Sequence, residues 1–108
     1  MNSSTDRLRV NVEADGAGVT LQVTGDIDPA TAPVLGRRLD EAVVSGFPTI
    51  ALDLREVQFV DSAGLRVLIR ANHEIRRHGR RLCLRSPSPP VQRVLEVTGL
   101  DEILEIVP

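Results

Sequence analysis

A chain of 108 residues, 42% of them hydrophobic, has the length and composition of one globular domain and leaves little room for a second. Its formal net charge of −2 and its aromatic share of 2% argue against a duplex-binding protein, which needs a basic footprint, and against a stacking surface for sugars or single strands. The single cysteine, Cys83, excludes an internal disulfide or a cysteine-based metal site, and the polar N-terminus and short apolar runs predict a cytoplasmic protein with neither a secretion signal nor a membrane span.

The N-terminal part of the chain has the pattern of a β-hairpin. Residues Leu8 to Ala14 alternate apolar and polar side chains, which is typical of a half-exposed strand. Asp15 to Gly18 supply residues that tolerate a tight turn, and Val19 to Thr24 alternate again. We expect residues 1–7, before this hairpin, to be flexible, and the ordered core to span about 8–107.

A helix is predicted from about Thr31 to Ser45. Thr31 is a suitable N-cap, and Pro33 is tolerated only in the first turn of a helix, where its missing N–H has no partner in any case. Gly46 ends the helix. The side chains expected to face inward are Leu35, Leu39, Ala42 and Val43.

The middle of the chain predicts a central strand and a second helix. Thr49 to Leu54 form a nearly continuous apolar run, which favours a strand covered on both faces. Asp61 or Ser62 then caps a helix that runs to about His78, with Gly79 as its stop. Its expected inward stripe consists of Leu65, Leu68, Ile69, Asn72 and Ile75.

The C-terminal part continues the alternation of strands and helices. Arg81 to Arg85 predict a short strand, in which we expect Cys83 to be a small buried residue, and Ser88 caps a third helix that ends at Thr98-Gly99. Ile103 to Ile106 predict a last short strand. A hairpin followed by alternating helices and strands indicates an α/β single domain, residues 1–108, with a mixed β-sheet and covering helices.

The stretch around Ser62 carries the strongest functional signal. An apolar run ends at Asp61 and Ser62, and a helix begins at once, so Ser62 lies where backbone N–H groups lack intrahelical partners. Such a place favours negative charge by about 0.3–1 kcal/mol and can accept a phosphate, and Gly64, without a side chain, would let a partner approach the hydroxyl. The simpler interpretation, favoured by local sequence alone, is that both residues are helix caps.

Three other functions are less favoured. A Ser-His hydrolase is unconvincing because Ser62 and His73 are eleven residues apart, about 16 Å along a helix, and no converging acid, base and nucleophile are found. Asp53 could mark an aspartyl-phosphate receiver, but the acidic pair that would hold magnesium is missing. The arginine cluster is better explained as a solvated helix end than as an anion site; it comprises Arg76, Arg77, Arg80 and Arg81.

Motifs spread along nearly the whole chain resemble the STAS domain of anti-sigma factor antagonists, also called anti-anti-sigma factors. The matching pieces occur in order as Thr24-Gly25-Asp26-Ile27-Asp28, Thr31-Ala32, Leu52-Asp53-Leu54, Phe59-Val60-Asp61-Ser62-Ala63-Gly64-Leu65, Ser86-Pro87-Ser88 with Val94-Leu95, and Thr98-Gly99-Leu100. Each piece alone is weak. Their common order and spacing, in a chain of the right length, make the resemblance strong.

The resemblance implies that Ser62, directly after Asp61, is a phosphorylation site, and that Asp28, Asp61, Ser62, Ala63 and Gly64 bind the partner. The family often has a second Ser or Thr where this chain has Ala63. The implied partners are an anti-sigma factor that is itself a serine kinase with a histidine-kinase-like ATPase fold, and a PP2C-type, metal-dependent phosphatase. No metal or organic cofactor, nucleic acid, membrane or enzymatic activity of the chain's own is expected.

Partner switching is the mechanism that the resemblance implies. Unmodified protein would bind the anti-sigma factor and release a sigma factor, and phosphate on Ser62 would abolish that binding. The alternative is a STAS adaptor module without a phosphoswitch, in a signalling or transport complex, whose binding would be indifferent to charge at Ser62.

Overall fold

A mixed β-sheet forms the centre of the molecule. The computed structural model describes residues 3–4 and 7–108. Over these residues, six strands are hydrogen-bonded in the order in which they occur along the chain. Their bounds are Ser3–Ser4 (β1), Leu8–Ala14 (β2), Val19–Gly25 (β3), Thr49–Glu56 (β4), Arg81–Arg85 (β5) and Glu105–Val107 (β6). The predicted mixed sheet and N-terminal hairpin are therefore confirmed.

The sheet changes direction at β3. Strands β1, β2 and β3 pair antiparallel, with Val10 opposite Val23, whereas β3, β4, β5 and β6 run parallel, with Leu52 beside both Leu21 and Leu84. The two-residue strand β1 was not anticipated, since residues 1–7 were expected to be flexible. For residues 1, 2, 5 and 6 that expectation lies outside the described part of the chain.

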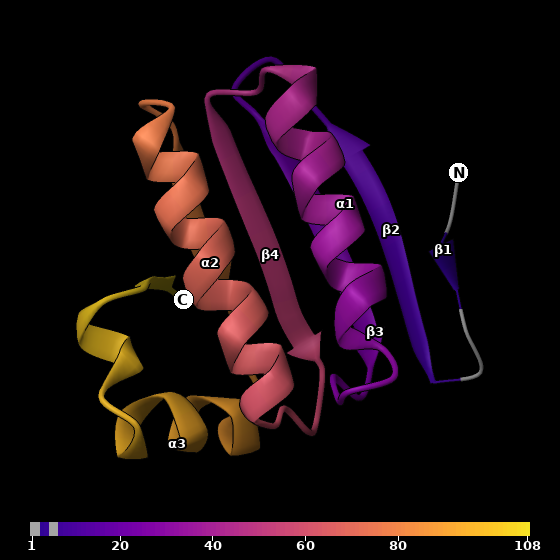
Figure 1. Ribbon diagram of the computed structural model, residues 1–108, viewed down its shortest axis with the longest axis vertical. Helices are drawn as coiled ribbons and strands as arrows, with labels where there is room; N and C mark the ends of the chain where they lie inside the picture. Colours follow the sequence, from indigo (N-terminus) through magenta and orange to yellow (C-terminus); the bar gives the residue numbers. More distant parts are fainter. Residues whose placement is uncertain (1–2, 5–6) are drawn as a thin grey trace.

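Two long helices cover one face of the sheet. These are α1 (Ala32–Ser45) and α2 (Ser62–Arg77), which lie side by side in front of the strands in Figure 1. The shorter α3 (Pro89–Val97) lies at the edge where β4 ends, and a 3-10 helix, η1 (Leu100–Glu102), leads from it towards β6. No helix among the described residues is long and apolar enough to cross a membrane.

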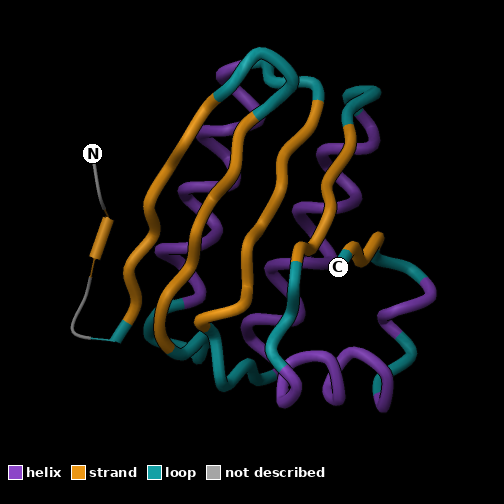
Figure 2. The backbone as a smooth tube through the Cα atoms, turned by 180° about the vertical axis from the view of Figure 1, so that it is seen from behind, coloured by secondary structure: helices purple, strands orange, loops and turns teal. Residues whose placement is uncertain are grey.

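The prediction that β4 is covered on both faces is wrong for one of them. Seen from behind, the strands lie in front of α1 and α2, and the near face of the sheet has no helix over it (Figure 2). Side chains alternate between the faces of a strand. In β4, Ile50 and Leu52 are fully buried, while Asp53 on the opposite side is only half-buried. The sequence looked continuously apolar because Ala51, which lies between Ile50 and Leu52 and points to the opposite side, is also apolar.

The core lies between this sheet and the two helices. It is aliphatic, as the low aromatic content requires, and includes Leu35 and Leu39 of α1 with Leu68 and Ile75 of α2. Cys83 of β5 is buried, as predicted. The pKa of its thiol is raised, mainly because burial disfavours the charged thiolate.

Two details of the predicted packing are wrong. Ile69, assigned to the inward stripe of α2, is 43% exposed, because the buried face of this helix is narrower than predicted and consists of Gly64, Leu68, Asn72 and Ile75. The last strand, predicted at Ile103 to Ile106, is shifted to Glu105–Val107, because η1 and a turn use the residues after Gly99.

Candidate functional site

Three loops meet at the edge where the parallel strands end. Ile27, after β3, donates its amide to the carbonyl of Phe59 at 2.9 Å and accepts the amide of Asp61 at 3.1 Å. The loop after β5 is joined to the same place, because the buried Ser88 hydroxyl donates to the carbonyl of Val57. Ser88 is at the N-cap position of α3 as predicted, but its hydroxyl makes no cap hydrogen bond. These ties fix the start of α2 relative to its neighbours.

Asp28 organises the loop that leads into α1. Its carboxylate oxygen Oδ1 accepts the amides of Ala30 at 2.9 Å and Thr31 at 3.0 Å, and Arg7 forms an ion pair with the other oxygen. Thr31 is the N-cap residue as predicted, but its hydroxyl does not cap the helix. It donates instead to the carbonyl of Asp26 at 2.8 Å and accepts the amide of Asp28 at 2.9 Å.

The charge of Asp28 is matched by this environment. Burial raises the pKa of its carboxyl, but the hydrogen bonds from Thr31 and Ala30 and the positive charge of Arg7 together outweigh burial. The pKa therefore lies below the ordinary value, and the group is a carboxylate at neutral pH. With the whole residue only 8% exposed, Asp28 offers little surface to a partner. Its position on the partner-binding side stays a prediction.

Asp61 is the N-cap of α2. Its backbone is extended (φ −111°, ψ −171°), and its Oδ1 accepts the amides of Ala63 at 2.9 Å and Gly64 at 3.2 Å. The first intrahelical bond runs from the Leu65 amide to the Asp61 carbonyl at 2.9 Å. Of the two cap candidates in the sequence, Asp61 takes the role. Ser62 is thereby left as the first helical residue, with its side chain outside the cap.

Ser62 is exposed on a rigidly held backbone. Within residues 3–4 and 7–108, its hydroxyl makes no hydrogen bond with another part of the chain. Ala63, next in sequence, is half-buried and packs against the core, so it fixes the position of its neighbour. The arrangement presents one hydroxyl to solvent at the start of a helix whose first turn is anchored on both sides.

Gly64 is required by the packing inside the protein. A Cβ atom at this position would lie 2.6 Å from Cγ2 of Ile27 and 2.7 Å from Cγ2 of Val60, which is closer than real atoms approach. The prediction that its missing side chain opens access to the Ser62 hydroxyl is therefore wrong. The missing side chain lets α2 pack directly on the loop after β3, and Gly64 itself is buried.

The sequence pattern did not predict the exposed side chain of Phe59 in the loop beside Ser62. One of two phenylalanines in the chain, it lies in the loop before Asp61 and is 49% exposed. Its carbonyl is bonded to Ile27, so the exposed ring is carried by a fixed backbone. The sequence Val57-Gln58-Phe59-Val60 did not reveal which of its apolar side chains are buried: Val57 and Val60 are buried, and Phe59 is not.

Several of the other candidates raised by the sequence are engaged in ion pairs. Asp53 accepts both the amide and the Nε of Arg55 at 3.1 Å. In the arginine cluster, Arg77 pairs with Glu74 at 2.8 Å and Arg81 pairs with Glu105. His73 is exposed on α2, far along the helix from Ser62.

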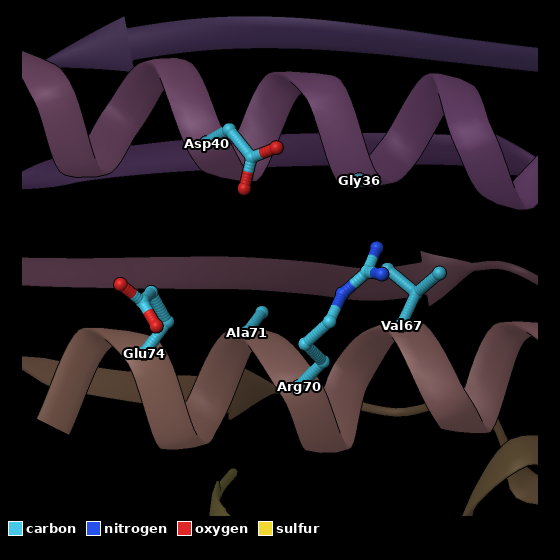
Figure 3. A pocket seen from close by; sticks show the side chains of 6 residues that line it. All are labelled: Gly36, Asp40, Val67, Arg70, Ala71 and Glu74. Atoms are coloured by element: carbon cyan, nitrogen blue, oxygen red, sulfur yellow. The ribbon is translucent and has the colours of Figure 1, made fainter. Parts of the chain in front are cut away.

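A shallow groove also runs between α1 and α2 (Figure 3). Its lining residues are Gly36, Asp40, Val67, Arg70, Ala71 and Glu74. The guanidinium of Arg70 extends across the groove towards α1. The groove lies along the middle of both helices and does not include Ser62 or the loops around it.

Comparison with known proteins gives consistent matches. The family model described as "Mlab, STAS domain" matches residues 10–108. The anti-sigma-B factor antagonist of Listeria monocytogenes is 35% identical over 94 residues, which are 87% of this chain and 82% of that protein. The anti-sigma F factor antagonist of Paenibacillus polymyxa is 29% identical over 92% of this chain and 86% of its own length.

Solved structures agree with these matches. A crystal structure of an anti-sigma factor antagonist from Mycobacterium paratuberculosis superposes with a TM-score of 0.86 at 27% identity, covering 98% of this chain and 90% of that one. The Bacillus protein SpoIIAA has the same fold at 21% identity, with TM-scores of 0.76 for its unphosphorylated and 0.70 for its phosphorylated form. Those comparisons cover 92% of this chain and 88% and 91% of the SpoIIAA chains. With the motifs, the mixed sheet and the family model in agreement, the chain belongs to the STAS-domain family of anti-sigma factor antagonists.

Proposed function

We propose that this chain antagonises an anti-sigma factor in the cytoplasm and that phosphorylation of Ser62 switches it off. The unmodified form binds the anti-sigma factor through the surface around Ser62, and a sigma factor is released. The partner is a serine kinase with a histidine-kinase-like ATPase fold, and a PP2C-type phosphatase reverses the modification. The observation that carries the proposal is the exposed hydroxyl of Ser62, which has no hydrogen-bond partner among residues 3–4 and 7–108, at the start of a helix anchored by Asp61, in a family of such antagonists.

The switch consists of two chemical steps, phosphorylation and dephosphorylation, and on this chain both take place at the Ser62 side chain. In the forward step the Ser62 Oγ forms a bond to the γ-phosphorus of ATP, the bridging P–O bond breaks, ADP leaves, and the hydroxyl proton is released. In the reverse step water attacks the same phosphorus, the bond between phosphorus and Oγ breaks, inorganic phosphate is released, and Oγ takes up a proton to restore the hydroxyl. SpoIIAA, which shares the fold, has been solved in a phosphorylated form, and this precedent supports the proposal.

Electrostatics is large enough to break the complex. Phosphate adds about −1.5 to −2 charges beside Asp61. Opposite one partner carboxylate at about 4–6 Å, an effective dielectric near 20 gives roughly 3–4 kcal/mol of repulsion per unit charge. The helix dipole returns at most about 1 kcal/mol. Even for a single unit of added charge, about 2–3 kcal/mol of repulsion remains, which corresponds to a loss of affinity on the order of a hundredfold, since about 1.4 kcal/mol is tenfold.

The test compares two variants that differ only in charge. The anti-sigma factor is retrieved with the unmodified chain, purified, and titrated calorimetrically with wild type, Ser62→Asp and Ser62→Asn. We expect wild type and Ser62→Asn to bind alike and Ser62→Asp to bind on the order of a hundredfold more weakly. Equal affinity of all three proteins would contradict the switch and favour the adaptor without a phosphoswitch.

A further inference from the structure

We propose that a phosphate on Ser62 forms an ion pair with Arg66 of the same helix. The modification would then change a contact within the chain as well as the contact with the partner. This inference rests on the proposed function, because it concerns the phosphorylated state of that site. It concerns a side chain one turn from Ser62 that neither the fold nor the family motif accounts for. The ion pair would form between the phosphate oxygens and the Arg66 guanidinium.

Spacing brings the two groups together. Ser62 is the first residue of α2 and Arg66 is the fifth, so the two lie on one face of the helix at the separation at which side chains touch. Helical side chains tilt towards the N-terminus, which carries the long Arg66 side chain back over the first turn. Both residues are exposed on the surface of α2.

Arg66 has no local reason to be basic. Among residues 3–4 and 7–108 it has neither an ion pair nor a side-chain hydrogen bond. The residues three and four positions before and after it are Ser62, Ala63, Ile69 and Arg70, none of them acidic. Arg70, four residues further along the helix, carries the same charge and is an unfavourable neighbour for it.

The other arginines of α2 differ from Arg66 because each has a favourable electrostatic or packing environment. Arg76 and Arg77 lie in the last turn, where a cation complements the helix dipole, and Arg77 also pairs with Glu74. Arg70 extends towards α1 over the groove in Figure 3. In a chain with a net charge of −2, α2 carries four arginines and one glutamate, and Arg66 is the arginine nearest to Ser62.

Fewer donors are free at the helix end than expected from the sequence. The carboxylate of Asp61 already accepts the amides of Ala63 and Gly64, which are donors that an incoming anion would use. Asp61 also repels a second negative charge. The nearest cation of the same helix is therefore the group to which the phosphate turns. Pairing would occupy the Arg66 guanidinium and make it unavailable for contacts with an acidic partner.

The experiment needs no partner protein. Phosphoserine is incorporated at position 62 of the full chain during synthesis, and the second ionisation of the phosphate is followed by 31P NMR in wild type, Arg66→Gln, Arg66→Lys and Arg70→Gln. An adjacent cation favours the dianion, so the phosphate pKa in wild type should lie on the order of half a unit to one unit below that in Arg66→Gln. Arg70→Gln should resemble wild type, and Arg66→Lys should lie between wild type and Arg66→Gln because it keeps the charge but loses the bidentate fork.

Two results would overturn the pairing. One is an equal phosphate pKa in wild type and Arg66→Gln. The other is an equal rise in Arg70→Gln and Arg66→Gln, which would indicate the general field of the helix rather than a pair. Either result leaves partner binding by the unmodified chain untouched. Conversely, Ser62→Asp binding the anti-sigma factor as tightly as wild type would contradict the proposed switch, whatever the phosphate pKa.

Discussion

Asp28 is 8% exposed and its carboxylate is bonded to Ala30, Thr31 and Arg7, whereas the hydroxyl of Ser62, one loop away at the same edge of the sheet, is exposed and has no internal hydrogen bond among the described residues. The resemblance assigned both residues to the partner-binding side. The structure gives them different physical roles: Asp28 holds the loop into α1, and Ser62 is presented by a helix start that Asp61 holds.

In the proposed switch, the residue that is modified is separate from the residues that stabilise the fold. The groups that fix the edge are buried and mutually bonded, so their replacement acts on folding. Ser62 takes no part in that network, so under the proposed function a phosphate could be added there and removed while the fold stays intact. Changes at the two kinds of position should therefore separate stability from binding.

The largest expected effect is on binding. Phosphoserine at position 62 should weaken binding to the anti-sigma factor about a hundredfold, through repulsion of roughly 3 kcal/mol net of the helix dipole. Thermal unfolding of the same protein should show that the native fold is retained. Calorimetric titration at two salt concentrations checks the cause, because a screened repulsion shrinks at high salt. A loss of affinity accompanied by unfolding would contradict the separation.

The next effect is on stability at Gly64. Gly64→Ala places a methyl group against Ile27 and Val60 and should lower the free energy of unfolding by about 1–3 kcal/mol, measured by urea denaturation. Gly36→Ala in α1 is the matched control. Its added Cβ would meet its nearest neighbours only at 3.8 Å, so stability should stay the same or rise by up to about 1 kcal/mol. Equal effects of the two substitutions would contradict the packing argument.

A smaller loss is expected at Thr31. Thr31→Val removes the buried hydroxyl that joins Asp26 and Asp28 and should cost about 1–2 kcal/mol in urea denaturation. Thr98→Val removes a hydroxyl that is bonded to Val94, but water can replace that bond at an exposed position. Its effect should stay within about 0.5 kcal/mol. An equal loss of unfolding free energy in the two variants would contradict the description of the Asp28 loop as a buried hydrogen-bond network.

The pH dependence of stability isolates Asp28. Because its pKa is lowered on folding, the ionised carboxylate stabilises the fold above the ordinary value of 3.8, and this contribution disappears as the pH falls through the lowered value. Wild type should therefore exceed Asp28→Asn in thermal midpoint at neutral pH, and the gap should close in acid. A constant gap from pH 7 to pH 2 would mean that the carboxylate charge is not the source of the stabilisation.

The smallest expected effect is at Ser62 itself. Ser62→Ala removes an exposed hydroxyl and should change the free energy of unfolding by less than about 0.5 kcal/mol, while abolishing phosphate acceptance. A loss comparable to that of Thr31→Val would show that the hydroxyl belongs to the structural network after all.

The sequence allowed the elements and the start of α2 after Asp61 to be predicted, because these depend on local signals. Alternation predicted β2 and β3, proline and glycine marked the ends of α1, and the step from Val60 to Asp61 marked the start of α2. Exposure was harder, because it depends on what packs from elsewhere in the chain. Phe59 and Ile69 belong to apolar patterns but lie outside the core, and only the packing of Ile27 on Gly64 explains the glycine.

The most direct test of the switch is the intact mass of the protein purified from its native host, followed by peptide mapping. The account predicts a fraction heavier by one phosphate, located on Ser62, and its absence from a Ser62→Ala strain. A chain that carries no phosphate under any of several growth conditions, or that carries it at another residue, would contradict the proposed role of Ser62.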